Sequence, residues 1–320
     1  MKRTTIKDIA EKLQINISTV SRALSNHPDI SDPVKAKVRE MAELLHYHPS
    51  DFAINFRKKS SKVIGLIIPK LSMFFIPSII EGISAKLNND GYKFFILSSE
   101  ESLEIEAENL LTCSNSRVDG ILISLTKETK SLDHFKIAED LGIPVVIFDK
   151  SIDQKLFDQV LFDSVDSAER CAERLINDGC QKILAIFGNE NLEITEKRKL
   201  AFTKKMQLHP NIKCKIIHSD SAEIAKEKTE LILDYEDFDG FFAMSDEILA
   251  GLNIALVNRN IAIKEKKVIA ISEGILPKYL NSSYEFEKND GLKMGVKAAE
   301  ILLDKIINSK ESGVAQFYLI

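Results

Sequence analysis

The chain has 320 residues, 44% of them hydrophobic and 28% charged, and a formal net charge of −5. This length is enough for two or three domains with separate cores. No apolar run approaches the roughly 18 residues of a membrane span, and MKRTT leads directly into a charged segment instead of a secretory leader, so we expect a cytoplasmic protein with no membrane partner.

The first segment repeats apolar residues at i, i+3, i+4 and i+7, which predicts an amphipathic helix with one buried stripe: Ile6, Ile9, Ala10 and Leu13. Asn16 is a good N-cap for a second helix that begins at Ile17. A third stripe follows Ser31-Asp32-Pro33, where Ser31 or Asp32 can cap and Pro33 suits a first turn, and it contains Val34, Val38, Met41 and Leu45.

The second helix is predicted to have two different faces. Val20, Ala23 and Leu24 cluster on one side, while the other side carries Ile17, Ser18, Ser21 and Arg22. One face then packs inward and the other is free to read a DNA groove, as in a helix-turn-helix. By periodicity alone, TVSRAL also fits an ordinary amphipathic surface helix.

The charge distribution favours the DNA-binding interpretation. Residues 1–62 carry 12 Lys and Arg against 7 Asp and Glu, a net charge of +5, so the remainder of the chain is −10. A basic head on an acidic body is typical of a protein that contacts phosphates at one end only.

From Val63 onward, short β-rich runs alternate with amphipathic stretches. The runs are VIGLII, KFFIL, GILIS and PVVIF, then LFD, KILAIF, KIIH, GFFAM and VIAIS. This alternation predicts parallel, doubly wound sheets, and a change of character near Val160 predicts two α/β lobes. Helices are expected near 79–89, 134–141, 168–177, 222–234 and 247–258, with another through Arg198 and a last one over 291–307.

Ligands of such sheets bind beyond the carboxyl ends of the strands. The residues in those positions are candidates for contacts with a small molecule: Met73 to Ile76 with Phe75 among them, Asp149-Lys150, Ser245-Asp246 and Ser272-Glu273.

Long stretches of the chain resemble a bacterial transcription regulator of the lactose/galactose repressor (LacI/GalR) family. The resemblance begins with IKDIAEKLQINISTVSRALSNHPDIS and HYHPSDFAINFRKKSSKVIGLIIP. It continues in order through VDGILIS, PVVIFDK, LINDGCQKI, the Arg198-x-x-Ala-Phe segment, FDGFFAMSDE and MGVKAAEILL. It implies an N-terminal all-α helix-turn-helix headpiece followed by a two-lobed α/β effector domain like a periplasmic binding protein.

The implied boundaries are a headpiece over 1–47, a hinge helix or linker over 48–61 and an effector-binding and dimerisation domain over 62–320. Its first lobe is expected to span 62–161 plus 289–320, and its second lobe 162–288. The chain ends at QFYLI without that family's usual final strand and tail, so we expect a shortened C-terminus.

The resemblance places the second helix in the major groove of DNA. The implied contacts are Thr5, Ile17, Ser18, Thr19, Ser21 and Arg22, joined by Asn55 and Phe56 of the hinge. Arg22 can pair with a guanine, whereas Ile17 either meets a thymine methyl group or covers the core edge. Phe56 occupies the position of an apolar wedge that enters the minor groove, although the same segment also fits a flexible linker. Gln14 stands where the family often has glycine, which should cost little unless its φ is positive.

For the effector, the resemblance implies a sugar or related metabolite. Asp149 and Arg198 match the family pattern, whereas Ser245 replaces the usual Asn, Ser272 the usual Asp and Ala201 the usual Gly; Leu192 and Ile194 precede Arg198. The expected site is Phe75, Asp149, Arg198, Ser245, Asp246 and Ser272. The departures leave open a different selectivity, a degenerate pocket that binds nothing, or an Asp149–Arg198 pair that is only structural.

The expected function is therefore a repressor that binds a pseudo-palindromic operator as a homodimer and responds to a small polar effector, without a cofactor. A sugar-binding transport protein would lack the basic head. An enzyme is disfavoured because GxxxxGK[ST], GxGxxG and HExxH are all absent. His46 and His48 flank a single residue beside a proline and are expected to be structural. The cysteines, at 113, 171, 180 and 214, lack metal spacing and are expected to be reduced thiols.

Overall fold

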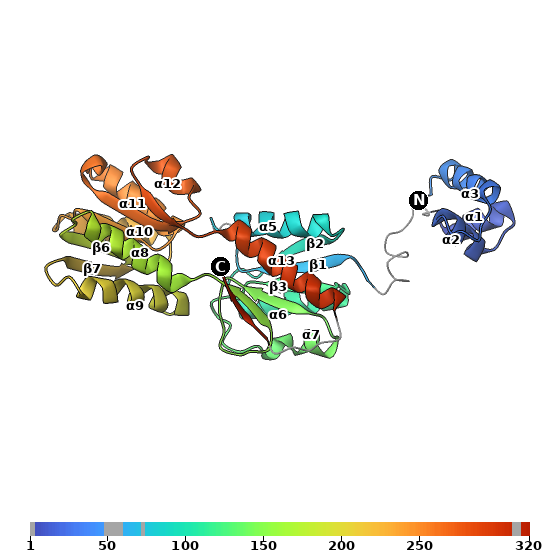
Figure 1. Ribbon diagram of the computed structural model, residues 1–320, viewed down its shortest axis with the longest axis horizontal. Helices are drawn as coiled ribbons and strands as arrows, with labels where there is room; N and C mark the ends of the chain where they lie inside the picture. Colours follow the sequence, from blue (N-terminus) through green and yellow to red (C-terminus); the bar gives the residue numbers. More distant parts are fainter. Residues whose placement is uncertain (1–3, 48–59, 72–73, 309–314) are drawn as a thin grey trace. The chain divides into compact units, whose positions relative to one another are not determined.

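The computed structural model describes residues 4–47, 60–71, 74–308 and 315–320 (Figure 1). The chain divides into two compact units, Met1–Ser61 and Lys62–Ile320. No helix in these described ranges combines the length and apolar character needed to cross a lipid bilayer.

The described part of the N-terminal unit, residues 4–47, contains three short helices around one small core. They are α1 (Ile6–Leu13), α2 (Ile17–Leu24) and α3 (Asp32–Leu44). The core takes two buried residues from each helix: Ile9, Ala10, Val20, Ala23, Val38 and Ala42. The helix starts match the sequence predictions, but the side chains of Asn16 and Ser31 make no capping hydrogen bond. Packing of the apolar stripes therefore defines this unit more than capping does.

The first lobe of the second unit is built on a six-stranded parallel sheet in the order β11-β5-β4-β3-β1-β2. Its strands are β1 (Val63–Ile68), β2 (Lys93–Ser98), β3 (Gly120–Ile123), β4 (Val145–Phe148), β5 (Asp158–Leu161) and β11 (Phe317–Leu319). Helices α5 (Ile76–Asn89) and α13 (Gly291–Ile307) cover one face. The other face is covered by α6 (Leu103–Asn115), a 3-10 turn (Asp133–Phe135) and α7 (Lys136–Asp140) (Figure 1).

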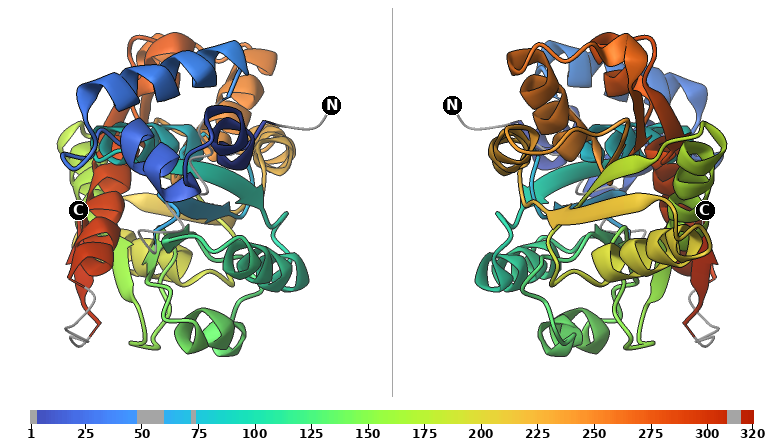
Figure 2. Two further views of the ribbon diagram at one scale, coloured as in Figure 1. Left: turned by 90° about the vertical axis from the view of Figure 1, so that its right-hand side faces the viewer. Right: turned by 90° about the vertical axis from the view of Figure 1, so that its left-hand side faces the viewer.

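The second lobe has a five-stranded parallel sheet in the order β10-β9-β8-β6-β7. Its strands are β6 (Lys182–Phe187), β7 (Lys213–His218), β8 (Gly240–Ala243), β9 (Lys267–Ser272) and β10 (Glu285–Lys288). Helices α8 (Ser164–Asn177) and α9 (Glu193–Gln207) cover one face, and α10 (Ala222–Leu233) and α11 (Asp246–Asn258) cover the other (Figure 2). A 3-10 turn (Ile263–Glu265) precedes β9, and α12 (Ile275–Leu280) follows it.

The predicted fold class, a helical head followed by two doubly wound parallel sheets, is confirmed. The chain passes to the second lobe after β5 and returns after β10, so α13 packs on the first lobe as expected. Most strands could be predicted from the sequence because of their burial. Helices cover both faces of each sheet, so the central strands are apolar throughout.

The structure differs from the predicted elements in three respects. The chain does have a final strand, because Phe317–Leu319 forms β11 and pairs with β5. The prediction missed α12 and β10 completely. The expected helices near 79–89 and 168–177 begin earlier, at Ile76 and Ser164. The short and polar elements lack a clear apolar period, so only their contacts identify them.

Candidate functional site

Helix α2 presents an exposed face opposite its buried face. Val20 and Ala23 are fully buried, whereas Ile17 is 44% exposed and Ser18 and Arg22 are exposed. The Arg22 guanidinium and the Ser18 hydroxyl have no hydrogen bond or ion pair within the described ranges. Their donors are therefore free for an external partner.

The alternatives for Ile17 differ in what its side chain covers. Ile17 is not among the apolar residues that pack against the headpiece core, and nearly half of its surface is open. Its exposure therefore favours contact with a ligand surface over a role at the core edge. Thr19 and Ser21, both half-buried, lie beside the buried face.

Thr5 starts α1 and already has an intramolecular partner. Its backbone N–H and its hydroxyl each donate to the same oxygen of Asp8, at 2.7 Å. This arrangement satisfies an otherwise unpaired amide of the first helical turn and places a carboxylate at the positive end of the helix. Thr5 is exposed, so its hydroxyl can reach an external phosphate only by leaving Asp8.

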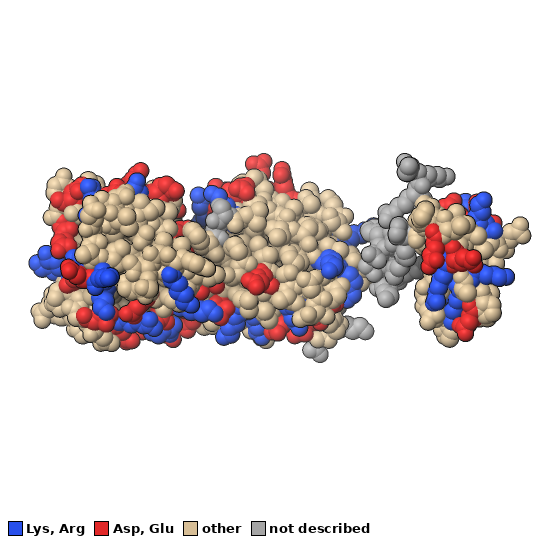
Figure 3. All heavy atoms as spheres, turned by 90° about the horizontal axis from the view of Figure 1, so that it is seen from above, with Lys and Arg blue, Asp and Glu red and all other residues tan. Residues whose placement is uncertain are grey.

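The two hinge candidates, Asn55 and Phe56, lie outside the described residues, as does His48. Figure 3 shows the described headpiece surface carrying both Lys and Arg and Asp and Glu side chains. Residues 4–47 carry six Lys and Arg and six Asp and Glu, so the net charge of +5 in residues 1–62 comes from the residues outside this range.

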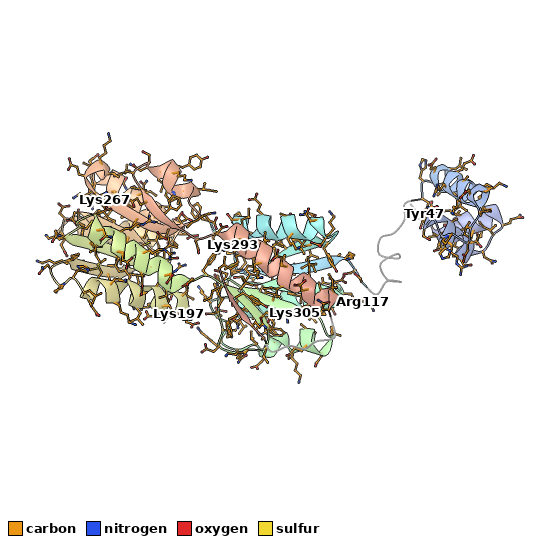
Figure 4. All side chains as sticks on the ribbon, viewed as in Figure 1. Tyr47, Arg117, Lys197, Lys267, Lys293 and Lys305 are labelled. Atoms are coloured by element: carbon orange, nitrogen blue, oxygen red, sulfur yellow. The ribbon has the colours of Figure 1, made fainter. Side chains whose placement is uncertain are left out.

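A cavity of about 440 Å³ is lined by residues of both lobes. The first lobe contributes Asp149, Lys150, Ser151 and the loop after β3, and the second lobe contributes 191–194 and Lys197. Figure 4 labels Lys197, near the start of α9. Of the six predicted effector residues, only Asp149 lines this cavity. Leu192 and Ile194, the two apolar residues that precede Arg198 in the sequence, line it as well.

Asp149 follows β4 and lies in the left-handed backbone region, with φ of 72°. Its carboxylate accepts a hydrogen bond from the Ser124 hydroxyl at 3.1 Å. Burial raises the pKa of Asp149, and the positive charges of Lys150 and Arg198 act in the opposite direction. Lys150 in turn donates to both oxygens of Glu101 at 3.1 Å, which fixes the strand end beside the cavity.

Arg198 lies on α9 and is only 4% exposed. One of its terminal nitrogens donates to the carbonyl of Met244 at 3.3 Å, and its Nε has no partner in the described part of the chain. Burial lowers the pKa of the guanidinium to about 10, and Asp149 opposes this shift. The two charges influence each other, but no ion pair joins them across the residues described here.

The buried hydroxyl of Thr195, one turn before Arg198 on α9, also lacks a partner in the described ranges. Buried polar groups are normally satisfied, so two unpaired donors on neighbouring turns of one helix need an explanation. An acceptor from a ligand would supply it.

Ser245, Asp246 and Ser272 lie together at the carboxyl ends of β8 and β9, as predicted. Asp246 accepts hydrogen bonds from the Ser272 hydroxyl and, at 3.2 Å, from the Glu273 backbone N–H. Ser245 caps α11 by accepting from the Ile248 N–H at 3.4 Å. These three side chains are occupied with one another and with the backbone.

Phe75 immediately precedes α5, and its ring lies 4.9 Å from that of Phe162. Phe162 lines the cavity and Phe75 does not. Sequence reasoning missed Phe162, Ser124 and Glu193. Ser124 directly follows β3, so the same search of strand ends would have found it, whereas no local signal distinguishes the other two.

Across the described residues, no cluster of three or more His, Cys, Asp or Glu side chains could bind a metal ion. The cysteines are free thiols; Cys113, Cys171 and Cys180 are buried and Cys214 is half-buried. Burial raises the pKa of Cys113 and of Cys171 to about 12.

Two family descriptions match the chain. Residues 5–50 match "Bacterial regulatory proteins, lacI family", and residues 64–281 match "Periplasmic binding protein domain". A sucrose operon repressor from Streptococcus mutans serotype c is 30% identical over 270 residues, which cover 82% of this chain and 81% of that protein. A ribose operon repressor from Halalkalibacterium halodurans is 28% identical over 249 residues, covering 78% and 73%.

Solved structures agree on the fold. The lac repressor dimer bound to operator and the anti-inducer ONPF has a TM-score of 0.84 and 19% identity, with 99% of this chain and 97% of that chain covered. A periplasmic binding protein/LacI transcriptional regulator from Alkaliphilus metalliredigens, complexed with D-xylulofuranose, has a TM-score of 0.69 and 24% identity, covering 81% and 95%. Relatives across most of the chain and matches to both units lead to one conclusion: the chain belongs to the lacI family of bacterial regulatory proteins.

Proposed function

We propose that this protein is a sequence-specific DNA-binding repressor that acts in the cytoplasm, binds a pseudo-palindromic operator as a homodimer and responds to a small polar effector. The observation that carries the proposal is the exposed face of α2, where Ser18 and Arg22 offer donors that have no partner among the described residues and Ile17 offers an apolar surface. Arginine and serine donors and apolar side chains on an exposed helix can contact base edges in a major groove.

In this proposal, residues 1–47 are the DNA-binding headpiece, 48–61 the hinge and 62–320 the effector-binding and dimerisation domain. Thr5, Thr19 and Ser21 contact phosphates, and Asn55 and Phe56 contact the minor groove. A single small headpiece reads few base pairs, so two copies are needed for a half-site pair. No catalytic role and no cofactor are proposed.

The DNA function is tested by selecting binding sites from random duplexes at a fixed salt concentration. We expect a symmetric site, and Arg22→Ala should bind it about 5- to 150-fold more weakly, since a bidentate arginine–guanine contact contributes roughly 1–3 kcal/mol. The matched control is Lys37→Ala, which removes an exposed cation on α3. It should lower the affinity only slightly, and by the same factor for the selected site and for unrelated duplexes. Failure to recover any symmetric site contradicts the dimeric operator.

For the effector, we propose a small polar ligand that binds between the lobes at the carboxyl ends of the strands, accepts hydrogen bonds from Arg198 and lies among Phe75, Asp149, Ser245, Asp246 and Ser272, of which Asp149 also lines the cavity described above. Support comes from the unpaired Nε of Arg198 and the unpaired hydroxyl of Thr195. A buried donor without a partner costs roughly 1–3 kcal/mol, which an acceptor on the ligand would recover.

One observation favours a second candidate, a regulator that binds no effector: Asp246 and Ser272 are hydrogen-bonded to each other and not open to a ligand. Isothermal titration against ribose, sucrose and fructose 1-phosphate separates the two. Binding that is lost in Arg198→Ala and kept in Lys204→Ala, an exposed cation on the same helix, supports the effector site. Absence of heat with every member of a broader metabolite panel supports the second candidate.

A further inference from the structure

Glu273 is a residue of the second lobe whose side chain contacts the first lobe. It directly follows β9, and its Oε1 accepts the backbone N–H of Gly291, the first residue of α13, at 2.6 Å. The hydroxyl of Ser78, the third residue of α5, acts to lower the pKa of the same carboxylate. One carboxylate thus bonds the second lobe to the first turn of α13 and interacts electrostatically with the first turn of α5.

The position suits a carboxylate. The first amides of a helix have no partner inside the helix and carry partial positive charge, so a negative group there is stabilised. Burial raises the pKa of Glu273, and the Gly291 N–H and the Ser78 hydroxyl oppose that shift. Gly291 permits the close approach, because a Cβ on it would lie 2.5 Å from Glu273 Oε1 and 3.1 Å from the Phe75 ring.

At its other end, Glu273 is bound to the polar cluster of the second lobe. Its backbone N–H donates to Asp246 at 3.2 Å, and Asp246 also accepts from the hydroxyl of the preceding residue, Ser272. Any ligand that displaces Asp246 or Ser272 therefore also changes the backbone that carries Glu273.

The first-lobe partner is a rigid pair of helices. Helices α5 and α13 pack so closely that a Cβ on Gly82 would lie 2.2 Å from the carbonyl oxygen of Leu292, and one on Gly295 would lie 2.1 Å from that of Ile79. Figure 4 labels Lys293 close to the start of α13. Two helices in backbone contact move together, so a force applied at their N-termini moves the whole layer.

Two other carboxylates of the second lobe each accept one hydrogen bond from the first lobe. The Phe74 N–H donates to Glu247 at 3.0 Å, and the Ser151 hydroxyl donates to Glu193 at 2.6 Å. Each of these carboxylates has one donor from the first lobe, and Glu193 is exposed. Glu273 is half-buried and accepts the first amide of α13, while its own backbone N–H is bonded to Asp246, so it links the polar cluster of the second lobe directly to a helix of the first lobe.

We propose that Glu273 is the positioning residue that sets the angle between the two lobes and couples the Asp246–Ser272 cluster to the α5–α13 pair. Its regulatory meaning rests on the proposed function, but its effect on lobe geometry does not. Loss of its carboxylate releases the lobes from their present angle even when neither DNA nor effector is bound.

The test measures the distance between the lobes in the full chain by double electron–electron resonance. Spin labels are attached at Glu104→Cys on α6 and Lys204→Cys on α9, two exposed positions, in a Cys214→Ser background in which the remaining native thiols are buried. Labelled chains are diluted with unlabelled protein so that only distances within one chain are read. The variants are Glu273→Gln, Glu273→Ala and Gly291→Ala.

We expect each variant to lower the population at the wild-type distance, relative to the population at longer distances, by about fivefold or more. A change of this size is expected for the loss of one hydrogen bond to a charged group. The matched control, Glu265→Gln, removes an exposed carboxylate of the same lobe and should leave the distribution unchanged. Thermal unfolding identifies variants that misfold, and Ser78→Ala, which leaves the Gly291–Glu273 hydrogen bond in place, should give a smaller shift.

Distance distributions for folded Glu273→Ala and Gly291→Ala that coincide with those of the wild type and of Glu265→Gln overturn the inference. The failure of a symmetric operator to appear in the selection experiment overturns the proposed function instead. The two results are independent, because the resonance experiment contains no DNA and no effector.

Discussion

Gln14 has a backbone conformation that residues with a side chain rarely adopt. It ends α1 with φ of 54° and ψ of 40°, and its N–H bonds to the last turn of the helix. The sequence suggested that a residue other than glycine would cost little here unless φ were positive, and φ is positive. The turn between α1 and α2 therefore contains a local cost.

Gln14→Gly should relieve that cost. A left-handed conformation costs a residue with a Cβ roughly 1–2 kcal/mol, and the greater freedom of glycine in the unfolded chain offsets about half of it, so we expect the headpiece to gain up to about 1 kcal/mol. Thermal unfolding of the headpiece measures the change. Lys37→Gly, in the exposed middle of α3, is the control and should destabilise by about 1 kcal/mol. A less stable Gln14→Gly protein would contradict the assigned conformation.

Glu106 organises the loop that lines the cavity. It is fully buried on α6 and accepts hydrogen bonds from the Thr126 N–H at 2.6 Å, the Thr129 hydroxyl at 2.8 Å and the His134 ring at 2.8 Å. Thr126 and Thr129 both belong to the cavity wall. Glu106 thus has a structural role that the Glu-rich sequence of α6 does not indicate.

Glu106→Ala should destabilise the second unit by about 3 kcal/mol, because it leaves several buried donors unpaired at once. Chemical denaturation followed by circular dichroism gives the free energy of unfolding. Glu108→Ala removes an exposed carboxylate of the same helix and should change that free energy by less than about 0.5 kcal/mol. Equal effects of the two substitutions would show that the loop does not depend on Glu106.

At the scale of elements, the contact between α5 and α13 decides how the last helix packs. More than 200 residues separate the two helices in the sequence, and glycines at positions 82 and 295 let their backbones touch. Small residues at a helix crossing bring the axes closer than larger side chains allow. The contact attaches the segment that returns from the second lobe to the start of the first.

Gly82→Ala should separate these helices. Its Cβ would lie 2.2 Å from the Leu292 carbonyl oxygen, a distance that backbone atoms can relieve only by moving apart, so we expect a loss of roughly 3 kcal/mol. The unfolding free energy of the second unit measures this loss. Glu81→Ala, at the adjacent exposed position, should be close to neutral. A neutral Gly82→Ala protein would mean that the helices do not pack this closely.

At the scale of the whole molecule, the headpiece and the two lobes have separate cores. The headpiece buries six apolar residues, whereas each lobe buries many more. A unit of this size buries a smaller fraction of its surface and is correspondingly less stable.

Calorimetry should therefore show two transitions, with the headpiece unfolding at the lower temperature. Adding the selected operator should raise that transition, because a ligand that binds only the folded form stabilises it. Gly82→Ala should shift the upper transition alone. A single two-state transition for the full chain would contradict independent units.

Much of this architecture follows from local sequence. The stripe from Ile6 to Leu13, the two faces of α2 and the apolar strands VIGLII and KILAIF predict their elements because burial on one or both faces imposes a period on the residues. The strand ends likewise located Asp149, Asp246 and Ser272, since parallel strands place their carboxyl ends at one edge of a sheet.

Only the tertiary structure reveals which of those residues meet. Phe317–Leu319 becomes a strand because β5 offers it an open edge, and Phe162, Glu193 and Glu273 acquire roles through partners that are distant in the chain. It also bonds Asp246 to Ser272, and it leaves Arg198 buried with no ion pair to any residue that the structure describes. Periodicity reports whether a residue is buried, but a hydrogen bond between lobes depends on distances that no local pattern encodes.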